Sequence, residues 1–136
     1  MRIESRIGSL KHKDEDIYTF LTDFNNLKNL IPADKIQNWV SDGDSCRFTV
    51  APLGEAGVKI LEKEPCKLIK LTGIDSVKYN FFLWIQIKRI EETDSRIKLT
   101  MEVDLNPMMQ AMVKKPLREF LNKVVDKLEN VNFTQV

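Results

Sequence analysis

Residues 96–128 read RIKLTMEVDLNPMMQAMVKKPLREFLNKVVDKL, and this stretch decides the fold because the spacing of its apolar residues changes at Asn106. Before Asn106, apolar side chains fall on alternate positions, which is the period of a strand with one buried face. After it, the spacing is that of a helix with a single apolar stripe. The stripe consists of Met109, Met112, Val113, Leu117, Phe120, Leu121, Val124, Val125 and Leu128. We therefore expect a strand over Arg96–Asn106 and then a long helix that covers a sheet.

Five further segments upstream have the character of strands. Tyr79–Glu91 repeats the strict alternation of apolar and polar residues. Four shorter segments precede it, and turn residues separate them from one another. These segments are Ile36–Asp42, Ser45–Ala51, Ala56–Glu64 and Lys67–Gly73. Together with Arg96–Asn106, they predict a meander of six antiparallel strands.

The N-terminal part of the chain adds one strand and two short helices. Arg2–Ser9 alternates, with Ile3 and Ile7 on one face, and predicts the first of seven strands. Asp14–Phe24 has apolar residues at helical spacing and acidic residues in its first turn, where negative charge complements the helix dipole. A second short helix follows, and Pro32 ends it because proline offers no amide hydrogen. The predicted order of elements is β-α-α-β6-α.

Composition and charge limit the class of protein. The 136 residues are 43% hydrophobic and 30% charged, which suits a single domain spanning residues 1–136. Lys and Arg total 21 against 20 Asp and Glu, and the lysines are scattered, so we expect no nucleic-acid partner. The charged N-terminus is unlike a signal peptide and no apolar stretch could span a bilayer, so we expect a cytoplasmic protein. Cys46 and Cys66 lack metal-type spacing, and we expect Cys46 to pack as a small apolar residue.

The order of elements, together with the sequence DIYTFLTDFNNL at residues 16–27 and the stop at Pro32, resembles the START-like, or Bet v 1-like, helix-grip superfamily. The resemblance is greatest to its small polyketide cyclase/dehydrase-type (SRPBCC) members, and it covers the chain from Ile3 to about Leu128. It implies an α+β fold in which a seven-stranded antiparallel sheet curves around the long C-terminal helix. It also implies a hydrophobic cavity between the sheet and that helix. Activities differ widely within the superfamily, so the fold alone does not fix the function.

The predicted interior is apolar, and two interpretations of it stay open. A filled core is the first, because most apolar stripes only pack. A cavity for a small apolar ligand is the second, and the methionines at one end favour it, because flexible thioethers adapt to varied ligands. By parity and helical spacing, the residues that face the interior are Phe48, Val50, Val58, Ile60, Ile69, Leu71, Phe81, Leu83, Ile85, Leu99, Met101, Val103, Met109, Met112, Val113 and Leu117.

Features near the expected cavity mouth also have two interpretations each. Pro116 lies inside the predicted helix, removes the hydrogen bond to the Met112 carbonyl and predicts a kink. The kink either lets the helix follow a twisted sheet or makes Met108–Lys115 a lid. The loops Pro52–Gly57 and Gly73–Lys78 are either ordinary hairpin connections or gates to the cavity.

Groups suited to catalysis are scarce. His12 is the single histidine and precedes the first helix, where we expect a solvated turn. Three hydroxyl side chains and one arginine could reach the interior ends of strands, namely Ser5, Thr72, Tyr79 and Arg89. Such groups more often make structural hydrogen bonds than take part in catalysis. The carboxylates near the last two strands fall on outward parities or in a turn, namely Glu91, Glu92, Asp94, Glu102 and Asp104. We therefore predict no catalytic residue, no metal site and no cofactor.

Three functional hypotheses follow. The leading one is non-enzymatic binding of a small hydrophobic ligand, lipid or polyketide-like, between the sheet and the C-terminal helix. The second is an enzyme of the polyketide cyclase/dehydratase type, which the resemblance permits. The third is an interaction module that uses the convex face of the sheet, where Phe82 and Trp84 point outward. These two aromatic residues either pack against cross-strand neighbours or form the interface of a homodimer.

Overall fold

The change of period at Asn106 is present in the computed structural model, which describes residues 1–30, 36–50, 54–74, 80–131 and 133. Strand β8 (Asp94–Val103) is followed by helix α2 (Pro107–Glu129). Asn106 caps α2, since its Oδ1 accepts a hydrogen bond from the Met109 N–H at 2.9 Å. From this cap α2 continues as one helix through Pro116, the position at which the sequence predicts a kink.

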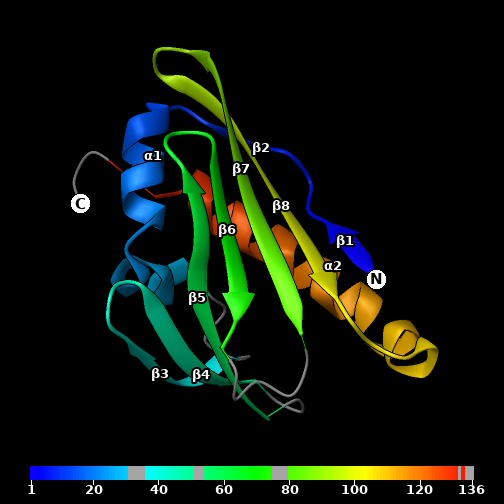
Figure 1. The fold of residues 1–136 in the computed structure, drawn as a ribbon. Coiled ribbons are helices and arrows are strands. Elements are labelled where there is room, and N and C mark those ends of the chain that lie inside the picture. Colours follow the sequence, from blue (N-terminus) through cyan, green and yellow to red (C-terminus); the bar gives the residue numbers. More distant parts are fainter. Residues whose placement is uncertain (31–35, 51–53, 75–79, 132, 134–136) are drawn as a thin grey trace.

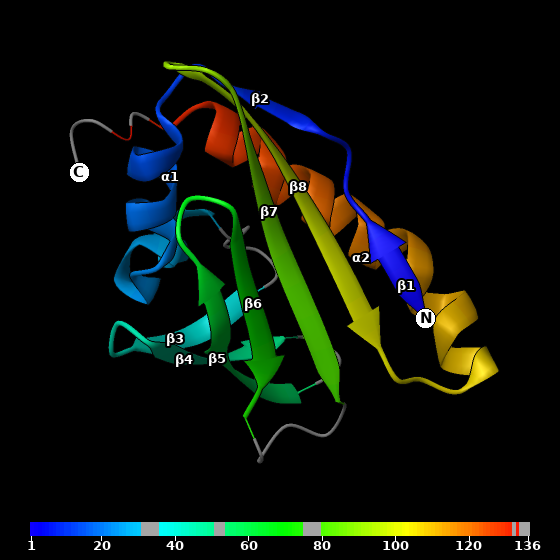
Figure 2. The same ribbon diagram turned by 45° about the horizontal axis from the view of Figure 1, so that its top comes forward.

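A single antiparallel sheet contains the eight described strands, in the order β1-β8-β7-β6-β5-β4-β3, and β2 also pairs with β8. The other strands are β1 (Arg2–Glu4), β2 (Gly8–Leu10), β3 (Ile36–Ser41), β4 (Ser45–Val50), β5 (Gly54–Glu64), β6 (Leu68–Gly73) and β7 (Phe81–Glu91). Figures 1 and 2 show the sheet curling so that β3 and β4 cross the end of the long strands, while α2 lies along one face. The predicted architecture, a sheet curved around the C-terminal helix, is confirmed.

The first predicted strand is divided in two, which accounts for eight strands where the sequence predicts seven. Both β1 and β2 pair with β8, but the N-terminal segment uses one more residue than β8 between the two pairings. Ser5 lies in this bulge, and its hydroxyl accepts a hydrogen bond from the Leu99 N–H at 2.9 Å. One extra residue reverses the parity of all that follows. Ile7, predicted on the buried face of Ile3, is therefore 64% exposed.

The two predicted short helices are confirmed as α1 (Asp14–Leu21) and η1 (Phe24–Leu30), the second being a 3₁₀ helix. Acidic residues occupy the first turn of α1, as expected from the helix dipole. The Phe24 N–H donates to the Gly43 carbonyl at 2.8 Å, which ties η1 to the turn between β3 and β4. The apolar faces of both helices join the buried core through Ile17, Phe20, Leu21, Phe24 and Leu30.

The C-terminal half of α2 lies tightly against the N-terminal strands. Leu121, Val125 and Leu128 are buried at this contact. Gly8 of β2 comes so close to the helix that a Cβ atom at this position would lie 2.6 Å from Val125 Cγ1. Because Val125 is fully buried and its β-branched side chain has few alternative rotamers, it cannot readily give way. The helix therefore depends on the absence of a side chain at Gly8.

Polar contacts hold the same half of α2. The Arg6 side chain forms ion pairs with Asp126 and Glu129, and the backbone N–H of Arg6 donates to Asn122 Oδ1 at 2.8 Å. Glu129 also accepts a hydrogen bond from the Ser9 N–H at 2.9 Å. The hydrogen bond from Arg6, with that from Ser9, holds the pKa of Glu129 below its ordinary value. These contacts connect Arg6, in the bulged segment, and Ser9, in β2, to the C-terminal turns of the helix.

Substituting Gly8 tests the close approach. We expect Gly8→Ala to destabilise the protein by about 1–3 kcal/mol, because the added methyl group overlaps Val125. Chemical denaturation measures the loss. In the double variant Gly8→Ala, Val125→Ala the overlap is absent, so its destabilisation should be smaller than the sum of the two single effects. A Gly8→Ala protein as stable as the parent would contradict the described packing.

Acid tests the contact between Arg6 and Glu129. A carboxyl whose pKa is lowered by folding contributes stability above its ordinary value of 4.5, and this contribution disappears as the pH falls through the lowered pKa. Glu129→Gln should therefore reduce the free energy of unfolding at neutral pH, by less than about 1 kcal/mol because the pair is partly exposed. In urea denaturation, the free energies of unfolding of the parent and the variant should become equal as the solution is made acidic. A difference that does not change with pH would show that the ion pair contributes nothing.

Candidate functional site

The apolar stripe of α2 is covered unequally along its length. Its C-terminal half is buried, whereas Met109, Val113 and Leu117 in the N-terminal half are only half-buried. Met108 and Met112 are 75% and 65% exposed. Met112, predicted to line the interior, thus lies at the outer surface of the helix. The helix is closest to β1, β2, β8 and η1, so it covers one side of the curved sheet most closely.

The same gradient of burial runs along the inner face of β7 and β8. Their inward cross-strand pairs are Ile87 with Ile97, Ile85 with Leu99, Leu83 with Met101, and Phe81 with Val103. The first two pairs are buried and the last two are half-buried. A short connection joins the half-buried end of β8 to the half-buried start of α2 (Figure 2). The interior is therefore least covered where β7 begins, β8 ends and α2 begins.

The other predicted lining residues fall into three groups. Val58, Ile69 and Leu71 are buried, and Phe48 and Ile60 are half-buried and pack against the core. Val50 ends β4, and its side chain lies outside the described part of the chain. The loops Pro52–Gly57 and Gly73–Lys78, interpreted above as hairpin connections or gates, lie partly outside it as well, since residues 51–53 and 75–79 are not described. The described lining is apolar throughout.

Trp39 is an inward residue that strand parity does not find. The register of β3 against β4 shifts between Gln37 and Val40, so that Asn38 and Trp39 together lie opposite the single residue Phe48. The Trp39 ring stacks on Phe48 with 5.5 Å between centroids and 10° between planes. Its Nε1 atom is buried and has no hydrogen-bond partner among the described residues. The apolar pattern of the sequence does not reveal a bulge of this kind. The alternation continues after the inserted residue, but the side chains that follow point to the opposite face.

Polar side chains that the sequence places near the strand ends take structural contacts. Thr72 Oγ1 donates to the Phe81 carbonyl at 3.2 Å, and Arg89 is exposed. Tyr79 lies outside the described residues. His12, expected to be solvated, instead packs edge to face on Phe133 with 5.1 Å between ring centroids. In these described residues, none of the contacts directs a polar group toward the end of the interior that is least covered.

Carboxylates lie on the outside of the described structure. Glu91, Glu92, Glu102 and Asp104 are exposed, as their parity or turn position predicts. Asp94 is half-buried, and its ion pairs with Arg96 at 2.6 Å and Lys11 at 3.3 Å hold its pKa below the ordinary value. Within the described ranges, no three His, Cys, Asp or Glu side chains gather as a metal site would require.

The two cysteines are free thiols in different environments. Cys46 of β4 is 4% exposed and packs in the core, as predicted from the sequence. Burial raises its pKa to about 12. Cys66 lies in the turn between β5 and β6, is half-buried and adopts a positive φ of 62°. Burial also raises the pKa of Cys66, with Asp14 and Glu15 adding to the effect.

The outer face of β7 carries the predicted aromatic pair. Phe82 is 38% exposed and Trp84 is half-buried, with 5.9 Å between their ring centroids. Lys70 of β6 places its Nζ 4.7 Å from the centroid of the Phe82 ring and 5.2 Å from that of Trp84. This cation–π packing covers the pair from the β6 side.

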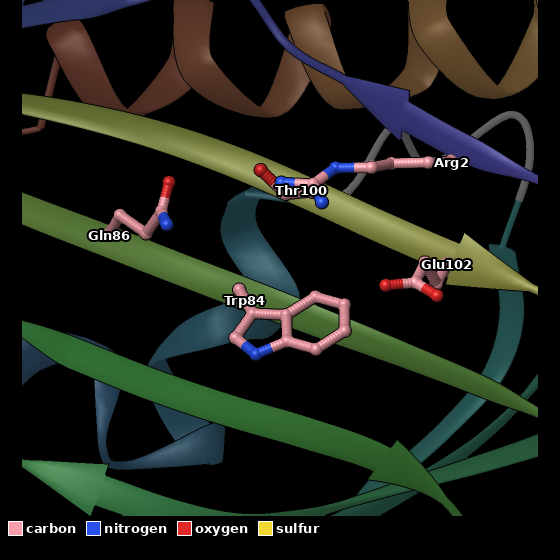
Figure 3. A pocket seen from close by; sticks show the side chains of 5 residues that line it. All are labelled: Arg2, Trp84, Gln86, Thr100 and Glu102. Atoms are coloured by element: carbon pink, nitrogen blue, oxygen red, sulfur yellow. The ribbon is translucent and has the colours of Figure 1, made fainter.

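A depression of about 230 Å³ lies on the β8 side of Trp84, lined by Arg2, Trp84, Gln86, Thr100 and Glu102 (Figure 3). Thr100 is 1% exposed, and its Oγ1 is buried without a hydrogen-bond partner in the described structure. In Figure 3 the Arg2 side chain extends along β8 toward Thr100. The depression was not predicted, because it requires β1, from the start of the chain, to pair with β8 beside β7.

Solved structures share this arrangement of elements. Protein XoxI from Bacillus cereus has a TM-score of 0.72 and 11% identity, covering 95% of this chain and 93% of that one. A START superfamily protein from Mycobacterium smegmatis has a TM-score of 0.67 and 12% identity, covering 96% and 99%. Norcoclaurine synthase from Thalictrum flavum, in complex with dopamine and hydroxybenzaldehyde, has a TM-score of 0.65 and 16% identity, covering 97% and 88%. The chain has the START-like, or Bet v 1-like, helix-grip fold that the sequence predicts.

Similarity at these identities concerns the fold and not the activity. No protein-family model and no curated protein sequence matches the chain. Among the described helices, none combines the length and the apolar character that crossing a bilayer requires. The function must therefore be argued from the geometry of the interior and of the outer sheet face.

Proposed function

We propose that the protein binds, in the cytoplasm, a small apolar molecule between the inner face of the sheet and the N-terminal half of α2. The observation that carries this proposal is the coincidence of two gradients of burial. The inner faces of β7 and β8 and the stripe of α2 all pass from buried to half-buried toward the same end of the interior. A ligand that enters at this end would cover apolar surface that the protein leaves partly exposed to water.

Burial of apolar surface supplies the affinity in this proposal. Each square ångström of apolar surface removed from water contributes about 25 cal/mol, so covering a few half-buried side chains is enough for moderate binding. Met101 and Met109 belong to the half-buried set, and their flexible thioethers can adjust to ligands of different shape. The described lining offers an uncharged ligand a compatible surface, whereas a charged one would lose its hydration without a counter-charge.

The fold is compatible with both binding and catalysis. In norcoclaurine synthase the same fold holds dopamine and hydroxybenzaldehyde, and that protein is an enzyme by name. A cyclase or dehydratase would need an acid or a base inside the cavity. Among the described residues, the carboxylates near β7 and β8 are exposed or ion-paired, and His12 packs on Phe133. We therefore propose binding without turnover.

Paired substitutions at two methionines test the proposed site. Met101→Lys places a long charged side chain in the half-buried lining, where it can reach solvent without unfolding the core. Titration with the neutral dye Nile red should show Kd raised by about tenfold or more, because the charge must be desolvated when the dye binds. Met112→Lys makes the same change at an exposed position and should leave Kd within about twofold. Equal dye affinity in the parent and Met101→Lys, or no saturable binding by the parent, would refute the site.

The outer sheet face supports a second candidate function, association of two copies of this chain. The pairing register aligns Lys70, Trp84, Thr100 and Glu4 in one row across β6, β7, β8 and β1. A two-fold axis between β7 and β8 would place Trp84 over the depression of the second copy, and the reverse. It would also place Lys70 opposite Glu4 of the second copy, so the ends of the row are complementary in charge.

In the proposed dimer, the depression of each copy would receive the Trp84 side chain of the other. Its volume of about 230 Å³ suits an indole ring, and the indole N–H of Trp84 could then donate to Thr100 Oγ1 of the second copy. That oxygen is buried and lacks a hydrogen-bond partner among the described residues of its own copy. Because the contact is reciprocal, Thr100 Oγ1 would accept one such hydrogen bond in each copy. The same contact would cover Phe82. We propose this homodimer in addition to ligand binding.

A charge exchange tests the dimer. In sedimentation equilibrium, Lys70→Glu and Glu4→Lys should each weaken self-association, because each places like charges opposite one another. The double variant restores opposite charges and should recover much of the association. Val40→Ser, at an exposed apolar position on β3, should leave association unchanged. A parent that stays monomeric at every concentration, or a double variant weaker than both single variants, would refute this interface.

A further inference from the structure

The buried indole N–H of Trp39 is an unused hydrogen-bond donor on the inner face of the sheet. Trp39 packs against the core and stacks on Phe48, which belongs to the apolar lining. Its Nε1 atom is buried, and no residue in the described part of the chain offers it a hydrogen-bond acceptor. Buried donors are almost always paired in folded proteins, because an unpaired donor loses its hydrogen bond to water without replacement. An indole in this position is therefore a candidate for a partner that comes from outside the chain.

The backbone next to Trp39 is distorted in a way that turns this indole inward. Asn38 has a positive φ of 57°, which a non-glycine residue adopts only at a cost. With regular pairing, Trp39 would lie opposite Arg47 on the outer face, but the bulge places it opposite Phe48 instead. Its neighbour Val40 then takes the outward position and is 67% exposed. Strain and bulges of this kind concentrate at binding sites, where they direct a particular side chain.

We propose that Trp39 Nε1 is the polar anchor of the ligand site and selects apolar molecules that carry a neutral acceptor oxygen, as in a ketone, an aldehyde or an ester. This inference rests on the proposed function, because it assigns the chemistry of the same site. An N–H group recognises an acceptor and gives nothing to a ligand that offers only donors. A neutral carbonyl suits the apolar lining of Phe48, Ile60 and Leu83, whereas a carboxylate would be desolvated there without a counter-charge.

Two ligands that differ only in the acceptor test the anchor. The probes are 2-acetylnaphthalene, which carries a carbonyl oxygen, and 2-isopropenylnaphthalene, which replaces that oxygen with a CH₂ group of similar shape. Trp39→Phe keeps an aromatic ring on Phe48 and removes the donor. It should weaken binding of the ketone by about three- to tenfold and change binding of the hydrocarbon by less than about twofold. Ile7→Ser, at an exposed position between β1 and β2, should change neither affinity.

A measurement on the parent protein keeps the test independent of how the variant folds. Nuclear magnetic resonance of the two indole N–H groups distinguishes Trp39 from Trp84, since the Trp39 signal disappears in Trp39→Phe. Addition of the ketone should move the Trp39 signal downfield, and addition of the hydrocarbon should not. If both probes bind the parent but affect the Trp39 N–H alike, the anchor is refuted while the proposed function stands. If neither probe binds, the proposed function fails and the anchor fails with it.

Discussion

The contact between Gly8 and Val125 is the constraint on which the rest of the structure depends. A long helix can cover a curved sheet only if it is fixed at some point, and here the fixed point is the C-terminal half of α2. Glycine lets β2 approach the helix more closely than any other residue would. The ion pairs of Arg6 with Asp126 and Glu129 add polar contacts beside it. With this half of α2 held down, the other half determines how much of the sheet is covered.

The N-terminal half of α2 gives the interior its asymmetry. From Leu121 toward Met109 the helix passes from full burial to half burial, and the inner faces of β7 and β8 follow it. A chain that only needed a stable core would seal both ends, because half-buried apolar surface contributes less to stability. The fold therefore separates two tasks along one helix. One half stabilises the domain, and in the proposed function the other half contacts the ligand.

Regular periodicity could be predicted from the sequence, and departures from it could not. The change from strand to helix at Asn106 was predictable because a period of two and a period of 3.6 select different faces. The bulges at Ser5 and Asn38 were not, since each inserts one residue and reverses the faces of its neighbours. Ile7 was thus assigned to the wrong face, and Trp39 was missed. The apolar lining on β7 and β8 came from parity, whereas the outer depression depends on a register that joins β1 to β7 through β8.

The reactivity of the Cys46 thiol reports local opening of the sheet around β4. Only a thiolate reacts readily with alkylating agents, and burial keeps this thiol protonated and out of reach in β4. Cys66, half-buried in a turn, is the more accessible of the two. Modification of Cys66 thus reports the folded surface, and modification of Cys46 reports separation of β4 from its neighbours. Because β4 carries Phe48 beside Trp39, the difference in rate between the two thiols follows the breathing of that end of the sheet without any added label.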